Sequence, residues 1–172
     1  TKMDEIDGHC NPNFTYGYVA QAVFADVNIQ TGEVRLRDVI SVNDVGKAIN
    51  PMQVEGQIEG CVVQAAGYVI LENWKKRNTR ALTKELSTYL IPTVLDIPDR
   101  TRSIILEYPD PIGPYGARGM GEMPFLPFAP ALIDAVYHAT GIRFHSFPLT
   151  AERVLRGLGK LAPEVSGFWD YE

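Results

Sequence analysis

The chain has 172 residues, of which 45% are hydrophobic and 22% are charged, and its formal net charge is −5 at pH 7. This composition is typical of a globular protein of about one domain. The acidic balance and the lack of a basic cluster argue against nucleic-acid binding, and no uninterrupted apolar run reaches the ~18 residues of a membrane-spanning helix.

The two cysteines indicate a reducing environment. Cys10 and Cys61 are too few for a disulfide framework, and they lack the spacing of metal ligands. The polar start of the chain contains no secretory signal peptide. We therefore expect free thiols and a cytoplasmic location. Because the first residue is Thr1, we expect the chain to be a fragment or a processed subunit.

The first regular elements predict a β-hairpin. Residues 16–29 are rich in β-branched and aromatic side chains on both faces, which predicts a strand that is covered on both sides. Residues 30–33 form a turn, and residues 34–42 predict the second strand. The apolar residues expected on one face of this second strand are Val34, Leu36, Ile40 and Val42.

A long helix with a polar stripe is predicted next. Asn50 followed by Pro51 has the form of an N-cap and a first helical residue, which predicts a helix over residues 51–71. Glutamines and glycines recur on one face of this helix with its 3.6-residue period. The stripe consists of Gln53, Gln57, Gly60, Gln64 and Gly67. It indicates close approach of another backbone or of a polar ligand; the alternative is tight packing against a strand, with the glutamines bonded to backbone groups.

Shorter elements complete the fold prediction. We expect short strands over residues 86–92, 103–107 and 142–147. Two further helices are expected, one that begins near Pro127 or Phe128 and ends at Gly141, and one over residues 151–158 that is capped by Thr150. Asp134 and His138 stand four residues apart and are candidates for a pair on the first of these helices.

These elements together predict an α+β fold, with helices packed on a mixed sheet, because strands and helices alternate without a regular βαβ rhythm. We expect one domain over residues 16–159. Residues 1–15 are expected to form an N-terminal arm or loop, and residues 160–172 a C-terminal tail.

The most distinctive chemistry lies in residues 116–122. Gly116, Gly119 and Gly121 allow a tight turn and close approach of a ligand. Glu122 follows at once and precedes an apolar run that predicts a buried helix, so it is a candidate general base in a partly dry place. The alternative is an acid favoured by the positive end of that helix. A nucleotide-binding role is disfavoured because the glycines match neither a Walker loop nor the order GxGxxG.

Several short motifs together carry a family resemblance. They are residues 14–17, 31–34, 44–46, 49–51, 56–60, 87–92 and 116–122. Each is weak alone, but their joint order and spacing are specific. Over about residues 14–158 the chain resembles the C-terminal part of the molybdenum-binding subunit of the xanthine dehydrogenase family, the molybdenum hydroxylases.

The resemblance implies roles for particular residues. Glu122 matches the family's active-site glutamate, the general base in a hydroxylation that adds water-derived oxygen to an electron-poor carbon of a purine, an aldehyde or an N-heteroaromatic compound. Gln57 matches the glutamine that hydrogen-bonds the pterin, and Gly119 and Gly121 would let the backbone come close to the metal centre. No side chain of this chain is expected to ligate the metal. The family usually has Lys where Arg118 stands.

The resemblance also implies cofactors and partners. The cofactor would be molybdenum-molybdopterin, with or without the cytosine dinucleotide extension, and [2Fe-2S] clusters and FAD would be carried by partner chains or domains. The remaining portion of the molybdenum-binding subunit would complete the site for a small-molecule substrate. The alternative is a non-catalytic assembly or binding module of the same fold; the presence of both Glu122 and Gln57 favours the enzyme.

Overall fold

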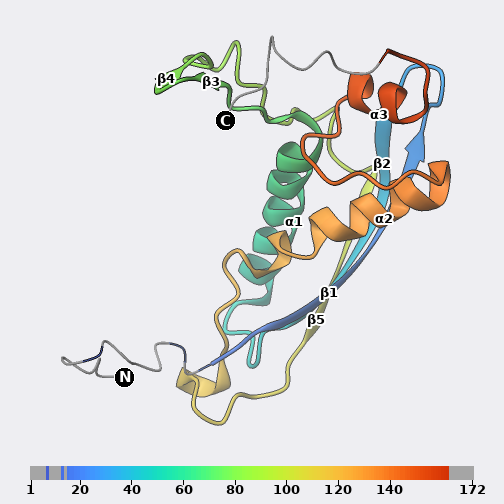
Figure 1. Cartoon of the computed structure of the whole chain (residues 1–172). Coiled ribbons are helices and arrows are strands. Elements are labelled where there is room, and N and C mark those ends of the chain that lie inside the picture. The colour runs from blue at the N-terminus through green and yellow to red at the C-terminus, as the bar shows by residue number, and fades with distance from the viewer. Residues whose placement is uncertain (1–6, 8–12, 14, 163–172) are drawn as a thin grey trace.

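The computed structural model describes residues 7, 13 and 15–162. The elements that make up the main body, in chain order (Figure 1), are β1 (Tyr18–Val27), β2 (Val34–Asp44), α1 (Pro51–Ala66), β5 (Arg100–Leu106), α2 (Phe128–Thr140) and α3 (Ala151–Gly157). A π-helical turn over Gly67–Leu71 continues α1. The smaller elements are β3 (Lys76–Arg77), β4 (Arg80–Ala81) and two 3-10 turns, η2 (Pro114–Gly116) and η3 (Met123–Phe125).

A mixed sheet with strand order β1-β2-β5 forms one layer of the molecule. β1 and β2 are antiparallel, which confirms the predicted hairpin, and β5 pairs in parallel with β2. The chain reaches β5 only after α1 and a long connection, as a parallel pairing requires. The predicted α+β fold with a mixed sheet is therefore confirmed.

A bulge changes which residues of β2 face the core. The register shifts between Phe24 and Ala25 of β1, which pair with Asp38 and Leu36 of β2. The extra residue Arg37 reverses the alternation of inward- and outward-facing side chains along β2. Leu36 therefore faces the helices before the bulge. After the bulge the buried residues are Val39, Ser41 and Asn43. The prediction that Ile40 and Val42 share a face with Val34 and Leu36 is therefore wrong.

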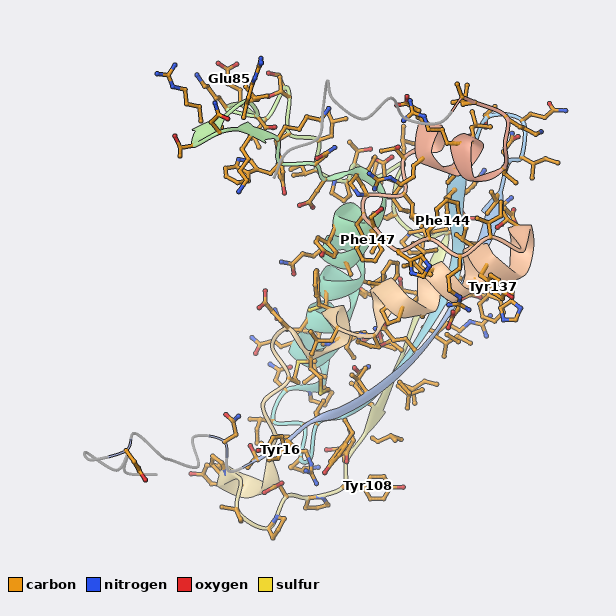
Figure 2. The ribbon with its side chains drawn as sticks, viewed as in Figure 1. Tyr16, Glu85, Tyr108, Tyr137, Phe144 and Phe147 are labelled. Carbon is orange, nitrogen blue, oxygen red and sulfur yellow. The ribbon has the colours of Figure 1, made fainter. Side chains whose placement is uncertain are left out.

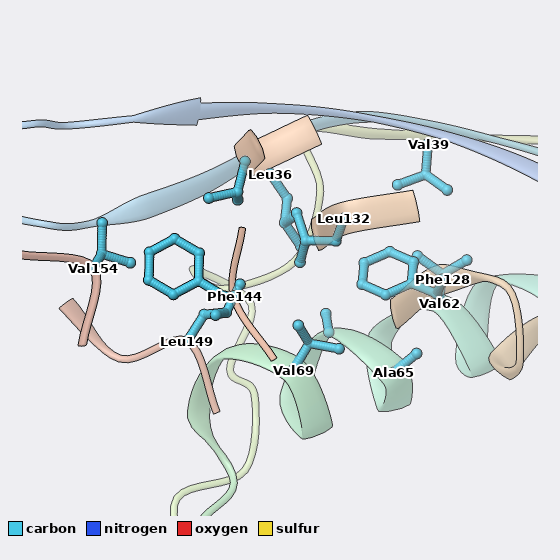
Figure 3. Packing of buried hydrophobic residues seen from close by; sticks show 12 residues of the cluster. Leu36, Val39, Val62, Ala65, Val69, Phe128, Leu132, Phe144, Leu149 and Val154 are labelled. Atoms are coloured by element: carbon cyan, nitrogen blue, oxygen red, sulfur yellow. The ribbon is translucent and has the colours of Figure 1, made fainter. Parts of the chain in front are cut away.

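Both long helices cover the same face of the sheet (Figure 1). Figure 3 shows the resulting core, in which Phe128 of α2 lies between Val39 of β2 and Ala65 of α1. Leu132 of α2 lies between Leu36 of β2 and Val69 of the π-helical turn. The opposite face of β1 is exposed, with Tyr18 and Phe24 among its residues. The prediction of a strand covered on both sides is thus wrong within the described part of the chain, where the outward-facing residues of β1 are exposed.

Local signals set the helix ends as predicted. Asn50 accepts a hydrogen bond from the backbone N–H of Gln53 at 3.2 Å and caps α1. Gly141 ends α2 in the left-handed conformation, with φ of 73°, and Thr150 caps α3 by accepting from the N–H of Arg153. The predicted end of the long helix at Leu71 is also confirmed, although its last turn is π-helical.

Three of the shorter predictions are wrong. Residues 86–92 form turns, in which Leu86 and Leu90 are exposed, and residues 142–147 form a loop that places Phe144 in the core. Both segments carry apolar residues but have no partner strand among the described residues. Asp134 pairs with Arg143 at 3.0 Å and not with His138. The segment between α1 and β5 instead contains the small β3–β4 hairpin.

Among the described residues, no helix combines the length and the apolar character needed to cross a membrane. Cys61 is a buried free thiol, as predicted. Cys10 and most of the expected arm and tail lie outside the described residues.

Candidate functional site

The loop that carries the three glycines is fastened to the end of β2. The N–H of Arg118 donates to the carbonyl of Val45 at 2.8 Å, and the N–H of Lys47 donates to the carbonyl of Gly116 at 2.7 Å. This close pairing requires glycine at two positions. Gly46 and Gly116 have positive φ of 62° and 78°, and a side chain on Gly46 would lie 2.2 Å from the carbonyl oxygen of Gly116. The loop therefore lies beside the start of α1.

Arg118 is the centre of a largely buried network. Its guanidinium donates to the carbonyl of Tyr16 at 2.7 Å and pairs with Asp110 at 2.9 Å, and it lies 3.8 Å from Asp44. The side chains of Arg118 and Asp110 are only 12% and 8% exposed. The carbonyl of Tyr108 also accepts a hydrogen bond from Arg118. Figure 2 shows Tyr16 and Tyr108 at the same end of the molecule. The network thus ties together the starts of β1 and of the glycine loop and the ends of β2 and β5.

Hydrogen bonds within the loop favour the ionised form of Asp110. The backbone N–H groups of Ile112 and Gly113 donate to its carboxylate at 2.9 and 2.8 Å. These two bonds, and after them the charge of Arg118, lower the pKa of Asp110 below its usual value. The carboxylate therefore remains charged opposite the guanidinium. This assigns to Arg118 the role of holding the loop together.

Replacing Arg118 by Met should leave two carboxylates without their cation and destabilise the loop. We expect the melting temperature of the full protein to fall by roughly 5 °C or more. Arg118→Lys keeps the charge but loses the forked contacts, and its melting temperature should lie between those of the other two proteins. Thermal unfolding of the three proteins checks this order, and equal melting temperatures for wild type and Arg118→Met would exclude a structural role.

Gln57 lies in a pocket between the glycine loop and α1. The pocket has a volume of about 270 Å³, and its lining includes Gln53, Gln57, Ala117, Arg118 and Met120. Gln57 is exposed, and its amide has no hydrogen-bond partner among the described residues. The polar stripe of α1 as far as Gln64 is likewise exposed, whereas Gly67 is buried against Pro92 and Glu72. The glutamines therefore do not bond to backbone groups in the described part of this chain, contrary to the packing alternative for the stripe.

Glu122 lies beside α1, one helical turn beyond Gln57. The thiol of Cys61 donates to the carbonyl of Gly121 at 3.3 Å, which places the residue before Glu122 against the helix. Burial raises the pKa of Cys61, and the negative charge of Glu122 raises it further. The loop thus brings both predicted polar site residues, Gln57 and Glu122, to the same stretch of α1.

The surroundings of Glu122 differ from both sequence-based interpretations. Its side chain is exposed, and the partly dry setting expected for a base is not formed by the described residues. It caps no helix: η3 begins after it without a side-chain cap, and α2 begins only at Phe128 and has no acid in its first turn. A helix-end charge effect falls off within one turn, so it does not account for an acid six residues before α2.

Four glycines on α1 and on the loop are not explained by contacts within the described residues. Gly56 and Gly60 on α1 and Gly119 and Gly121 on the loop lack positive φ, and a side chain added at any of them would meet no atom within 4 Å. A helical glycine costs on the order of 1 kcal/mol relative to alanine. Open space beside four glycines and an unpartnered amide fits a flat polar group that approaches the backbone from outside the chain. The residues present therefore fit a pterin cofactor.

Two features of the site escaped prediction from the sequence. The network of Arg118 with Asp44 and Asp110 joins residues far apart in the chain. The side chain of Gln21, on the inner face of β1, donates to the carbonyl of Pro124 at 2.7 Å; a polar residue within an apolar alternation was the one available signal. Within the described residues, no group of three or more His, Cys, Asp or Glu could hold a metal ion.

Known proteins share much of the sequence of this chain. A family model described as molybdopterin cofactor-binding domain matches residues 1–98, which include Gln57 but not Glu122. A probable xanthine dehydrogenase chain of Bacillus subtilis (strain 168) is 33% identical over 90% of this chain and 20% of its own length. A nicotinate dehydrogenase chain of Pseudomonas putida is 33% identical over 86% of this chain and 12% of its own length. The chain thus spans a fifth or less of these two relatives.

Solved structures agree with the sequence matches. Quinoline 2-oxidoreductase from Pseudomonas putida 86 aligns with a TM-score of 0.73 at 36% identity, over 79% of this chain and 18% of that one. Reconstituted CO dehydrogenase from Oligotropha carboxidovorans aligns with a TM-score of 0.78 at 27% identity, over 87% of this chain and 19% of that one. The chain therefore belongs to the molybdopterin cofactor-binding domain family of the xanthine dehydrogenase-type molybdenum oxidoreductases.

Proposed function

We propose that this chain forms one wall of the active site of a molybdenum hydroxylase, with Glu122 as the general base and Gln57 as a ligand of the pterin. The observation that carries the proposal is their common position: the contact between Cys61 and Gly121 brings Glu122 to the stretch of α1 that carries Gln57, and four glycines with open space lie on the same two elements. When bound, the molybdenum cofactor would supply oxygen transfer and accept the electrons from substrate. The chain itself would supply binding groups and one proton acceptor.

Gln57 suits a pterin because its amide offers both a donor and an acceptor. A pterin ring presents alternating donors and acceptors along one edge, and each must be paired once it is buried. Gly119 and Gly121 would bring backbone groups within reach of the same cofactor, because no side chain intervenes. These features of one ligand site occur on two elements that are joined by the contact between Cys61 and Gly121.

Glu122 suits a base because it is an unpaired carboxylate, within the described residues, on a loop that is well anchored on both sides. We propose that the remaining portion of the molybdenum-binding subunit covers it, so that it becomes partly desolvated in the assembled site. A carboxylate in that setting takes the proton that is lost as oxygen is added to an electron-poor carbon. Partners with [2Fe-2S] clusters and FAD would carry the electrons away, in a cytoplasmic complex.

The names of the relatives set the range of substrates to test. They include dehydrogenases of xanthine and nicotinate, an aldehyde oxidoreductase and a quinoline oxidoreductase. We propose a substrate of this kind, with an electron-poor carbon in a heterocycle or an aldehyde.

Metal and pterin analysis of the purified full-length protein, with its co-purifying chains, tests the proposal. We expect about one molybdenum and one pterin per chain, and turnover of xanthine, nicotinate or benzaldehyde with an artificial electron acceptor. A complex that contains neither molybdenum nor pterin would support the alternative, a non-catalytic assembly or binding module of the same fold.

A further inference from the structure

A row of polar side chains crosses the inner face of the sheet beneath the Glu122 segment. Gln21, Ser41 and Ser103 are direct neighbours on β1, β2 and β5, and Asn43 is next to them on β2. Ser41 and Asn43 are fully buried. Polar groups buried in this way are costly unless they are hydrogen-bonded, so a polar row in an otherwise apolar core calls for a purpose beyond packing.

Gln21 connects this row to the loop. Its Nε2 donates to Ser41 Oγ at 2.9 Å and to the carbonyl of Pro124 at 2.7 Å. Asn43 Nδ2 donates to the same Ser41 Oγ at 3.0 Å. The carbonyl of Pro124 can only accept, so the nitrogen of the Gln21 amide must face it. Both protons of that nitrogen are then used, which fixes the amide in one orientation.

Pro124, whose carbonyl accepts the hydrogen bond from Gln21, lies two residues after Glu122 in a stiff part of the chain. Within η3, the N–H of Phe125 donates to the carbonyl of Glu122 at 3.1 Å, and the ring of Pro124 restricts its own φ. On the other side, Cys61 holds the carbonyl of Gly121. Glu122 is therefore bracketed by one contact from α1 and one from β1. A shift of the Pro124 carbonyl would be transmitted to Glu122 rather than absorbed between them.

We propose that Gln21 is a positioning residue for Glu122, which holds the following turn through the carbonyl of Pro124 and so sets the place of the carboxylate beside α1. The inference rests on the proposed role of Glu122 for its effect on turnover, but the geometric part can be tested separately. The geometric reference point is Cys61, because its thiol holds the carbonyl of Gly121, the residue before Glu122.

The test uses the full purified complex with Gln21→Met, which keeps the length of the side chain and removes its donor. Ser41→Ala serves as a second, smaller change if Gln21→Met does not fold, because it removes the anchor of the amide. Ser103→Ala is the matched control: its Oγ is buried in the same row and has no hydrogen-bond partner among the described residues.

Two quantities are measured. The first is kcat and KM for the substrate that the wild type oxidises, and the second is the distance from Cys61 Sγ to the Glu122 carboxylate in crystal structures of the variants. In Gln21→Met we expect kcat to fall about 10- to 100-fold, as a displacement of about 1 Å would cause, with KM and molybdenum content near wild type. The carboxylate should lie about 1 Å or more from its wild-type position. Ser103→Ala should change neither quantity.

The outcomes separate the two proposals. A Glu122 carboxylate that keeps its wild-type position in Gln21→Met would overturn the positioning role. A displaced carboxylate in Gln21→Met, together with full turnover in Glu122→Gln, would support the positioning role and overturn the catalytic role of Glu122.

Discussion

Glu122→Gln should retain molybdenum and a normal fold but lose most of its turnover. Glutamine keeps the size and the hydrogen-bonding reach of the side chain, but it cannot accept the proton. A general base contributes typically about 10²- to 10⁴-fold to the rate, so we expect a loss of at least that order.

The matched control for this variant is Glu85→Gln. Glu85 is also an exposed carboxylate, but it lies at the end of the molecule opposite to Tyr16 and Tyr108 (Figure 2), far from the glycine loop. Turnover of this control should equal that of the wild type. Were Glu122 only an exposed surface acid, Glu122→Gln would leave turnover nearly normal.

Gln57→Ala should lower the retention of the cofactor. If its amide pairs with the pterin, the variant leaves a buried polar edge of the ring without a partner, at a cost of roughly 1–3 kcal/mol. This corresponds to about 5- to 150-fold weaker binding. The molybdenum content of the complex after extensive dialysis should therefore fall. Its melting temperature in the absence of cofactor should stay unchanged, because the side chain of Gln57 makes no hydrogen bond to the described residues.

Gln64→Ala provides the comparison for Gln57→Ala. Gln64 lies on the same exposed stripe of α1 but does not line the pocket between α1 and the loop. Its loss should leave the metal content unchanged. An equal fall in both variants would indicate a general effect on α1, and unchanged loading in both would count against a pterin contact at Gln57.

The parts of the fold that local chemistry determines were predictable from the sequence. Asn50 and Thr150 cap their helices through hydrogen bonds to residues three positions further along the chain. Gly141 ends α2 because glycine adopts the left-handed backbone conformation of this position without steric cost. The β-bulge was not predictable, because the extra residue in β2 has meaning only relative to β1. Strand pairing also depends on the rest of the fold. The apolar residues in the segments 86–92 and 142–147 favoured strands, although neither segment has a partner strand among the described residues.

In the site, the residues themselves were predictable from the sequence, but the contacts that position them were not. Its principal residues could be proposed because glycines, a carboxylate and a polar helix stripe are visible along the chain. The contacts that fix their positions could not, since Gln21 bonds to a carbonyl 103 positions away and Arg118 to one 102 positions away. The exposure of Glu122 was also unforeseen, because it depends on which surfaces the described chain leaves uncovered.

The central claim is that Glu122 acts as the base of a molybdenum site. The most direct test measures molybdenum content, melting temperature and turnover on one preparation each of wild type, Glu122→Gln and Glu85→Gln. We predict equal metal content and melting temperature in all three, with turnover lost only in Glu122→Gln. Turnover of Glu122→Gln within a few-fold of wild type, at full molybdenum loading, would contradict the claim.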